Sequence, residues 1–218
     1  VLSAIIAGQL TGALGSGMIA SAFGWRVSMA VGTLLAALAL IVTLWQLHPR
    51  ATAERPPLRL THLFEGYAQV FRNPKTVVCF TAVFIEGIVV FGLFPYIAVL
   101  LEQRGAGGLR EAGFVLAGFA LGGFVYIALI RLLLSRLGLY GVIRAGAAVA
   151  GLGFAALAFS VSWPVEMAIV FVIGLGFYMI HNALQTQATE LAPTKRASAV
   201  AAHAFFFFLG QAIGPLIY

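Results

Sequence analysis

The sequence is dominated by long apolar stretches that very few charged residues interrupt. A helix needs about 20 apolar residues to cross a bilayer whose hydrocarbon core is about 30 Å thick. Seven stretches meet this requirement, and they cover residues 2–23, 27–47, 76–101, 112–134, 142–161, 165–191 and 197–218. The sequence therefore predicts an all-α fold, a polytopic membrane helical bundle with seven transmembrane helices.

The composition excludes most classes of soluble protein. Of the 218 residues, 61% are hydrophobic and only 9% are charged, whereas about a quarter of a typical globular protein is charged. The net charge of +6 comes from 13 Lys and Arg scattered along the chain, so we expect no nucleic-acid partner. The single Cys79 forms no intrachain disulfide, and we expect no metal site and no cofactor.

The basic residues are distributed unevenly between the two sides of the predicted membrane. Cytoplasmic loops of membrane proteins carry the excess of Lys and Arg. Ten basic residues fall on one side, namely Arg50, Arg55, Arg59, Arg72, Lys75, Arg131, Arg136, Arg144, Lys195 and Arg196. Three fall on the other side, namely Arg26, Arg104 and Arg110. The sequence therefore predicts a multi-pass protein of the inner (plasma) membrane whose connection 48–75 is cytoplasmic.

This long connection divides the chain into predicted segments. Residues 1–47 would form the last two helices of an N-terminal six-helix half, and residues 76–218 the first five helices of a C-terminal half. The connection, residues 48–75, contains apolar residues at helical spacing, which predicts an amphipathic helix on the membrane surface. These residues are Leu60, Leu63, Phe64, Tyr67, Val70 and Phe71.

A short pattern recurs in the first and last predicted helices. The pattern Gly-Gln-x-x-Gly-x-Leu begins at Gly8 and again at Gly210, 202 residues later. Because these helices are six crossings apart, the repeat indicates two six-helix halves and twelve helices in all. On this interpretation the chain is a fragment whose partner is the missing N-terminal helices of the same polypeptide. The alternative is chance, because a membrane protein with 25 glycines produces such matches freely.

Three further groups of residues form recognisable local patterns. They are Gly8, Gly12, Ser16 and Gly17 followed by Gly24-Trp25-Arg26; the turn Ser135-Arg136-Leu137-Gly138; and Pro193-Thr194-Lys195-Arg196-Ala197-Ser198-Ala199 followed by Phe208-Leu209-Gly210 and Gly214-Pro215. Together they resemble the motifs of the major facilitator superfamily (MFS) of secondary transporters, in particular its drug/proton antiporter-like efflux branch. The resemblance implies that the chain covers about the fifth to the eleventh helix of an expected twelve. It also implies a central cavity lined by the seventh and tenth helices, here 76–101 and 165–191.

Glycines and prolines in these helices are expected to control helix packing and bending. Glycines four residues apart let neighbouring helices approach closely, and proline removes a backbone hydrogen bond. We expect packing or gating roles for Gly8, Gly12, Gly17, Pro95, Gly210, Gly214 and Pro215.

Glu86 lies near the middle of the predicted helix 76–101, between Ile85 and Ile88. A charge at this depth costs about 2.5–3.5 kcal/mol or more, so an ionisable residue there is a functional hypothesis by default. Desolvation favours the protonated carboxyl, and a carboxyl that takes up and releases a proton is what proton-coupled transport requires. The alternative is a permanently protonated Glu86 that hydrogen-bonds a neighbouring helix.

The predicted helix 165–191 carries polar side chains that share one face. These residues are Tyr178, His181, Asn182, Gln185 and Thr189. Lipid penalises such a face, so it should meet the bundle interior or a water-filled cavity, where it would suit a polar, uncharged or weakly charged substrate. Interhelical hydrogen bonding without ligand contact is the alternative. His181 is also a candidate for proton coupling, because imidazole titrates near neutral pH, and Gln211 is a further cavity candidate.

The resemblance implies a secondary active transporter that exports a drug, sugar or metabolite by alternating access, and Glu86 is the residue that points to proton coupling. We expect a monomer in the lipid bilayer whose ligands are a small molecule and protons. An enzyme is not expected, because the sequence contains no Gly-x-Ser-x-Gly or His-Glu-x-x-His motif and offers no catalytic residues. The rival interpretation is a non-transporting membrane receptor or assembly subunit with the same fold.

Overall fold

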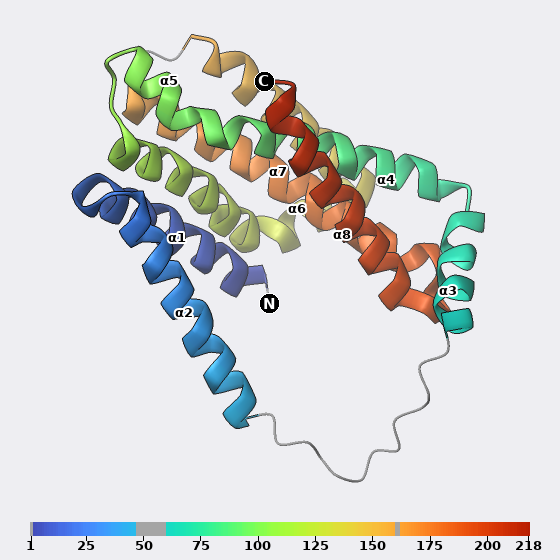
Figure 1. Ribbon diagram of the computed structural model, residues 1–218. Coiled ribbons are helices and arrows are strands. Elements are labelled where there is room, and N and C mark those ends of the chain that lie inside the picture. Colours follow the sequence, from blue (N-terminus) through green and yellow to red (C-terminus); the bar gives the residue numbers. More distant parts are fainter. Residues whose placement is uncertain (1, 47–59, 160–161) are drawn as a thin grey trace.

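The computed structural model describes residues 2–46, 60–159 and 162–218, and for residues 60–63 it describes the backbone only. This part of the chain is 93% helical and contains no strand, so the all-α prediction is confirmed. The α-helices, shown in Figure 1, are α1 (Leu2–Phe23), α2 (Trp25–Gln46), α3 (Leu60–Arg72), α4 (Lys75–Glu86), α5 (Ile97–Gln103), α6 (Leu109–Leu157), α7 (Trp163–Leu191) and α8 (Arg196–Ile213).

The seven predicted spans are present, although two of them are joined in one element. Among the described residues, six helical stretches are long and apolar enough to cross a membrane. One of them, α6, contains 49 residues. An ideal helix of that length would extend about 74 Å, far more than a bilayer requires. The α6 backbone leaves the helical region at Gly138, where φ is 65° and ψ is 175°, so α6 consists of two spans.

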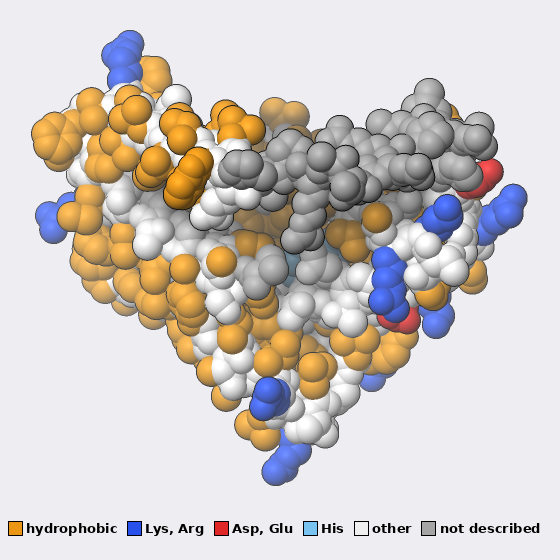
Figure 2. Space-filling view, turned by 90° about the horizontal axis from the view of Figure 1, so that it is seen from below, with side chains coloured by type: hydrophobic (Ala, Val, Ile, Leu, Met, Phe, Trp, Pro, Cys, Tyr) orange, Lys and Arg blue, Asp and Glu red, His pale blue; other side chains and the backbone are white. Residues whose placement is uncertain are grey.

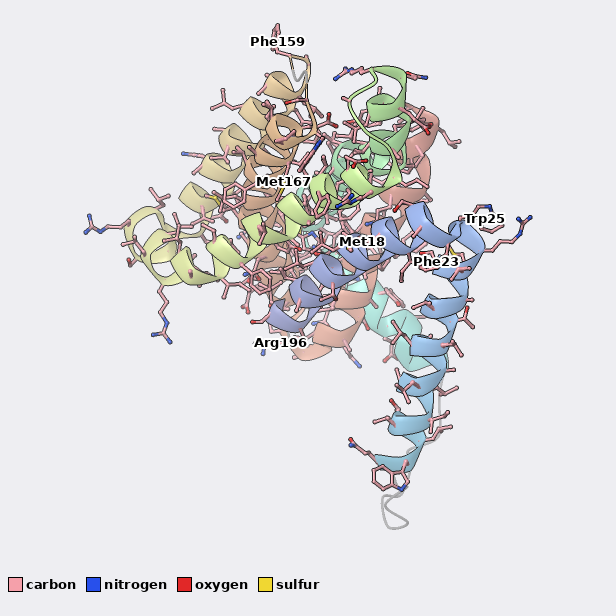
Figure 3. All side chains as sticks on the ribbon, turned by 90° about the vertical axis from the view of Figure 1, so that its left-hand side faces the viewer. Met18, Phe23, Trp25, Phe159, Met167 and Arg196 are labelled. Carbon is pink, nitrogen blue, oxygen red and sulfur yellow. The ribbon has the colours of Figure 1, made fainter. Side chains whose placement is uncertain are left out.

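Both spans of α6 pack against α7. In the first span, a Cβ added at Gly122 would lie 2.5 Å from the Leu175 nitrogen. In the second span, a Cβ added at Gly146 would lie 2.9 Å from the Gly176 carbonyl oxygen. The chain changes direction sharply between the two spans (Figure 3). Because glycine lacks a Cβ, the backbones approach closely, and α7 becomes the central helix of the described bundle.

The span from Lys75 to Gln103 is interrupted in its middle. α4 ends at Glu86, a π-helix (η1) follows at Gly87–Phe91, and a 3₁₀ turn (η2) at Phe94–Tyr96 leads into α5. Pro95 lies in this turn and has no amide hydrogen to donate to an α-helix. The interruption therefore places Glu86 at a boundary between α- and π-helix, and π-helical turns are frequent at functional sites.

α4 and η1 cross α8 in close contact. A Cβ added at Gly214 would lie 2.7 Å from the Ile88 carbonyl oxygen. A Cβ added at Gly210 would lie even closer to the carbonyl oxygen of Phe84. Gly210 and Gly214 therefore lie at a backbone-to-backbone helix crossing, which is visible in Figure 1 as the diagonal passage of α8 across α4 and α7.

The glycines of α1 fall into two groups. A Cβ added at Gly17 would lie 2.9 Å from the Leu109 carbonyl oxygen of α6. At Gly8 and Gly12, an added Cβ would meet no described atom within 4 Å. The described residues therefore do not give Gly8 and Gly12 the helix packing that their spacing predicts. Both glycines instead border a groove between α1 and α2, because α1 turns a different face toward α6.

α3 contacts the start of α8 through one edge of the apolar stripe that its sequence predicts. Val70 is 0% exposed, whereas Phe64, from the same stripe, is 73% exposed. Nε2 of Gln69 donates a hydrogen bond to Oγ1 of Thr194 at 3.0 Å, just before α8 begins. The earlier part of the predicted connection, residues 48–59, lies outside the described residues.

The outer surface of the bundle is apolar. α2 has no buried residue among those described, and its Leu34 and Trp45 are strongly exposed. Figure 2 shows hydrophobic side chains across the visible face, with Lys and Arg mainly near its edges. Phe23 and Trp25 lie at the turn between α1 and α2 (Figure 3), and both are exposed, as is Met18 of α1. Such a surface suits lipid, because a soluble monomer rarely exposes large contiguous apolar areas.

Candidate functional site

The last residue of α4 meets the middle of α7. Glu86 is only 7% exposed, and its Oε2 lies 2.8 Å from Nδ1 of His181. Its second carboxyl oxygen, Oε1, is buried and has no hydrogen-bond partner among the described residues. The two residues that the sequence proposes for proton coupling therefore form one pair between two helices, in which Glu86 is buried and His181 is partly buried.

Aromatic rings surround the imidazole of His181. The Phe177 ring stacks on it at a centroid distance of 5.0 Å, and the Phe207 ring of α8 lies 4.6 Å away. The ring of His203, also on α8, lies 5.2 Å away at an interplanar angle of 64°. Sequence reasoning missed His203, although the rule that singled out Glu86, an ionisable group inside an apolar span, applies to it as well.

The polar face of α7 bonds to three other helices. The Tyr178 hydroxyl donates a hydrogen bond to Oε1 of Gln9 in α1. Nδ2 of Asn182 donates to the hydroxyl oxygen of Tyr126 in α6 at 2.9 Å, and His181 supplies the contact with α4. The interhelical hydrogen bonds that the sequence left open as an alternative are therefore present. Gln9 and Tyr126 were not foreseen as partners, because nothing in their spacing connects them with α7.

Two predicted cavity residues do not join this group. Gln185 is exposed on α7, and Gln211 is partly exposed on α8. In the part of the chain that is described, neither side chain bonds to a member of the group. Thr189 donates its hydroxyl hydrogen to the Thr186 carbonyl oxygen at 2.7 Å, within its own helix. The structure therefore brings together only part of the polar face that spacing defines.

The two predicted prolines lie near one another at the same end of the bundle. Pro95 is exposed in η2, and Pro215 belongs to a 3₁₀ turn (η4, Gly214–Leu216) that follows α8. The Tyr96 hydroxyl donates a hydrogen bond to the Pro215 carbonyl oxygen at 2.6 Å. The bend in the α4–α5 span is therefore tied to the end of α8.

The Glu86–His181 pair can hold one proton in two arrangements. A carboxylate beside an imidazolium and a carboxylic acid beside a neutral imidazole contain the same number of protons and have no net charge. Loss of that proton leaves a negative charge in an apolar site, which burial disfavours. The pair can therefore take up or release one proton when its access to water changes. Among the described residues, no group of three His, Cys, Asp or Glu is arranged to hold a metal ion.

The comparison with known families identifies the family to which the chain belongs. The family model described as Major Facilitator Superfamily matches residues 1–215 of the 218. No curated protein matches the sequence. The match includes every helix from α1 to α8, and the seven spans fit the helical bundle of that family. The chain belongs to the Major Facilitator Superfamily of secondary transporters.

Proposed function

We propose that the protein is a proton-coupled transporter that exports a small molecule by alternating access, and that Glu86 and His181 hold the coupling proton. Family membership supplies the secondary transport. The observation that carries the proton coupling is the 2.8 Å contact between Oε2 of the buried Glu86 and Nδ1 of the partly buried His181, which joins α4 to α7.

A buried proton site couples to helix movement when its two groups come from different helices. Glu86 ends α4 where the π-helix begins, and His181 lies in the middle of α7. With one proton the pair is neutral, and its hydrogen bond favours the contact between α4 and α7. Separating the two helices would leave the groups desolvated and unpaired, which is costly. Proton release leaves a net negative charge in this apolar site, so it favours an arrangement of the two helices that exposes the pair to water.

The substrate class follows from the polar groups that α7 leaves available. Tyr178 and Asn182 already bond within the protein, while Gln185 is exposed. A neutral amide suits a polar, uncharged or weakly charged substrate such as a drug, sugar or metabolite. Export is supported by the resemblance of the residues around Gly17 and Trp25 to the efflux branch.

We also propose that the protein lies in the inner (plasma) membrane as a monomer. The orientation is supported by the excess of Lys and Arg on one predicted side of the membrane. This excess assigns the connection 48–75 to the cytoplasm. The rival interpretation, a receptor or assembly subunit, would leave the Glu86–His181 pair without a pH-dependent role.

Transport by the complete polypeptide in lipid vesicles with an imposed pH gradient tests the proposal. A fluorescent fluoroquinolone and a radiolabelled hexose represent the drug and sugar classes. We expect the pH gradient to drive movement of a probe, and we expect Glu86→Gln to abolish that dependence, because an amide cannot take up the proton. Glu102→Gln is the matched control, since this carboxyl lies in the same span but is exposed. Proton-driven movement that persists in Glu86→Gln would show that the coupling site lies elsewhere.

A further inference from the structure

A groove runs along the outside of the bundle between α4 and α8, next to the end of α3. Its volume is about 330 Å³, which is within the range of sites that hold small molecules. Val77 is 71% exposed and Leu209 is 37% exposed, so the groove opens onto the surface that faces lipid. Its apolar lining consists of Phe71, Val77, Phe80, Phe84, Phe206 and Leu209.

Aromatic rings from three helices form the wall of this groove. The ring of Phe80 on α4 stacks against that of Phe206 on α8 at a centroid distance of 5.1 Å. Phe71 of α3 meets both rings edge-on, at 5.9 and 6.4 Å. Phe80 is buried, so it lies at the bottom of the groove. The shape of the groove therefore depends on how α3, α4 and α8 pack together.

The groove extends from the membrane surface toward the middle of the bilayer. Its lining on α4 begins at Thr76, one residue after the start of the helix, and reaches Phe84. Eight residues of helix rise about 12 Å, and each leaflet supplies about half of a hydrocarbon core about 30 Å thick. The groove therefore covers most of the depth of the acyl chains of one leaflet.

α3 presents two adjacent faces at the surface end of the groove. Val70 and Gly66 are buried, so their face lies against the bundle. Phe64, Tyr67 and Phe71 share the neighbouring face, because they are three and four residues apart, and all three are exposed. Figure 1 shows α3 running across the ends of α4 and α8. The aromatic face therefore suits the membrane surface, as in other interfacial helices.

Arg72 places a positive charge beside the surface end of the groove. It follows Phe71, ends α3 and is exposed, and among the described residues it forms no ion pair. Glu65, the one acidic residue in the sequence of α3, precedes it by seven residues, about 10 Å along the helix axis. The guanidinium is therefore available to a phosphate group, which arginine binds well.

Positive charge prevails at this end of the bundle. Arg196 lies 3.8 Å from Glu190, which offsets one of the charges. Basic residues next to a membrane span attract anionic lipids, whereas a phosphatidylcholine would bring a further positive group. The described basic residues around the ends of α3, α4 and α8 are Arg72, Lys75, Lys195 and Arg196, and the acidic ones are Glu65 and Glu190.

We propose that this groove binds one anionic glycerophospholipid, with its phosphate at Arg72 and one acyl chain along Phe80 and Phe84. The lipid would bridge α3 to α4 and α8. The site does not involve Glu86 or His181, so it is independent of the proposed proton coupling. Only the assignment of the lipid to the inner leaflet follows from the proposed orientation.

A photoreactive phosphatidylglycerol, with a diazirine in one acyl chain, tests the site directly. The complete protein is placed in phosphatidylcholine nanodiscs that contain a small share of this probe, and mass spectrometry locates the label after illumination. We expect the label on the groove residues of α4 and α8. A phosphatidylcholine with the same diazirine, at the same share, should label them about fivefold less.

Two pairs of substitutions separate the site from general effects. Arg72→Gln should lower labelling of the groove about fivefold, the effect of one basic residue near anionic lipid. Lys75→Gln removes the same charge, but Lys75 lines a separate pocket with Glu190, so labelling should persist. Val77→Trp should fill the groove and exclude the lipid. Val78→Trp is its control, because Val78 is 73% exposed and is not among the lining residues.

Three results would overturn the inference. Equal labelling by the two lipids, unchanged by Arg72→Gln, would mean that ordinary boundary lipid covers the groove. Label that a fluoroquinolone displaces would assign the groove to a transported molecule, and label that avoids α4 and α8 would leave the groove without a lipid. None of these results bears on the Glu86–His181 pair, which transport in a pH gradient tests.

Discussion

Tyr178 and Gln9 are 169 residues apart in the sequence, yet the tyrosine hydroxyl donates a hydrogen bond to the glutamine side-chain oxygen. Tyr178 is buried, so the bond lies inside the bundle, where water competes little for either group. α1 lies in the predicted N-terminal half and α7 in the predicted C-terminal half. The bond therefore joins two segments that alternating access would move relative to one another.

Tyr178→Phe should lower the free energy of unfolding by about 0.6 kcal/mol, the average for hydrogen bonds between membrane helices. Only the hydroxyl is removed, so the packing of the ring against Gly123 remains. A double-mutant cycle with Gln9→Leu, measured by denaturation in mixed micelles, isolates the bond. If the two substitutions are simply additive, the two side chains do not interact in the folded protein.

Much of the fold could be predicted because lipid imposes a simple rule on helices. Long apolar stretches gave all seven spans, and the glycine at position 138 marked the turn inside α6. The rule says little about which faces meet. Gly8 and Gly210 begin the same sequence pattern, yet Gly210 lies against the backbone of α4 and Gly8 borders an open groove. Sequence spacing defines a face, and only the fold decides what covers it.

The candidate site was predicted in part for a related reason. An ionisable group in an apolar span is visible in the sequence, so Glu86 and His181 could be named. Their direct contact joins residues 95 apart, which no local pattern reveals. His203 carries the same sequence signal as Glu86, but nothing in its spacing connects it with His181. Its relevance emerges only when α8 brings its ring against His181.

Gly210→Ala should destabilise the protein by about 1–3 kcal/mol, because an added methyl group in a filled contact forces the backbones apart. The methyl group would collide with the carbonyl oxygen of Phe84. Gly8→Ala is the control from the same sequence pattern and should be neutral or slightly stabilising, since alanine favours a helix over glycine. Thermal unfolding of both variants in detergent checks this. Equal losses at the two positions would contradict the described crossing of α4 and α8.

Gly138→Ala should cost about 1–3 kcal/mol, because the region with φ near +60° and extended ψ is almost restricted to glycine. The backbone angles of Gly138, 65° and 175°, fall in this region. Gly151→Ala, on the second span of α6 where an added Cβ meets no described atom within 4 Å, is the control. The free energy of unfolding should separate the two variants. If both behave alike, the turn between the two spans does not depend on a glycine conformation.

Val70→Asp should release α3 from the start of α8, whereas Phe64→Asp should leave it in place. Val70 is buried against the bundle and Phe64, in the same predicted apolar stripe, is exposed, and a charge in an apolar contact without a partner is expensive. Hydrogen exchange of the α3 amides measures the difference. We expect fast exchange in Val70→Asp and protection close to the original level in Phe64→Asp. Protection retained in both variants would mean that the membrane surface stabilises α3. Its contacts with Thr194 and the start of α8 would then contribute little.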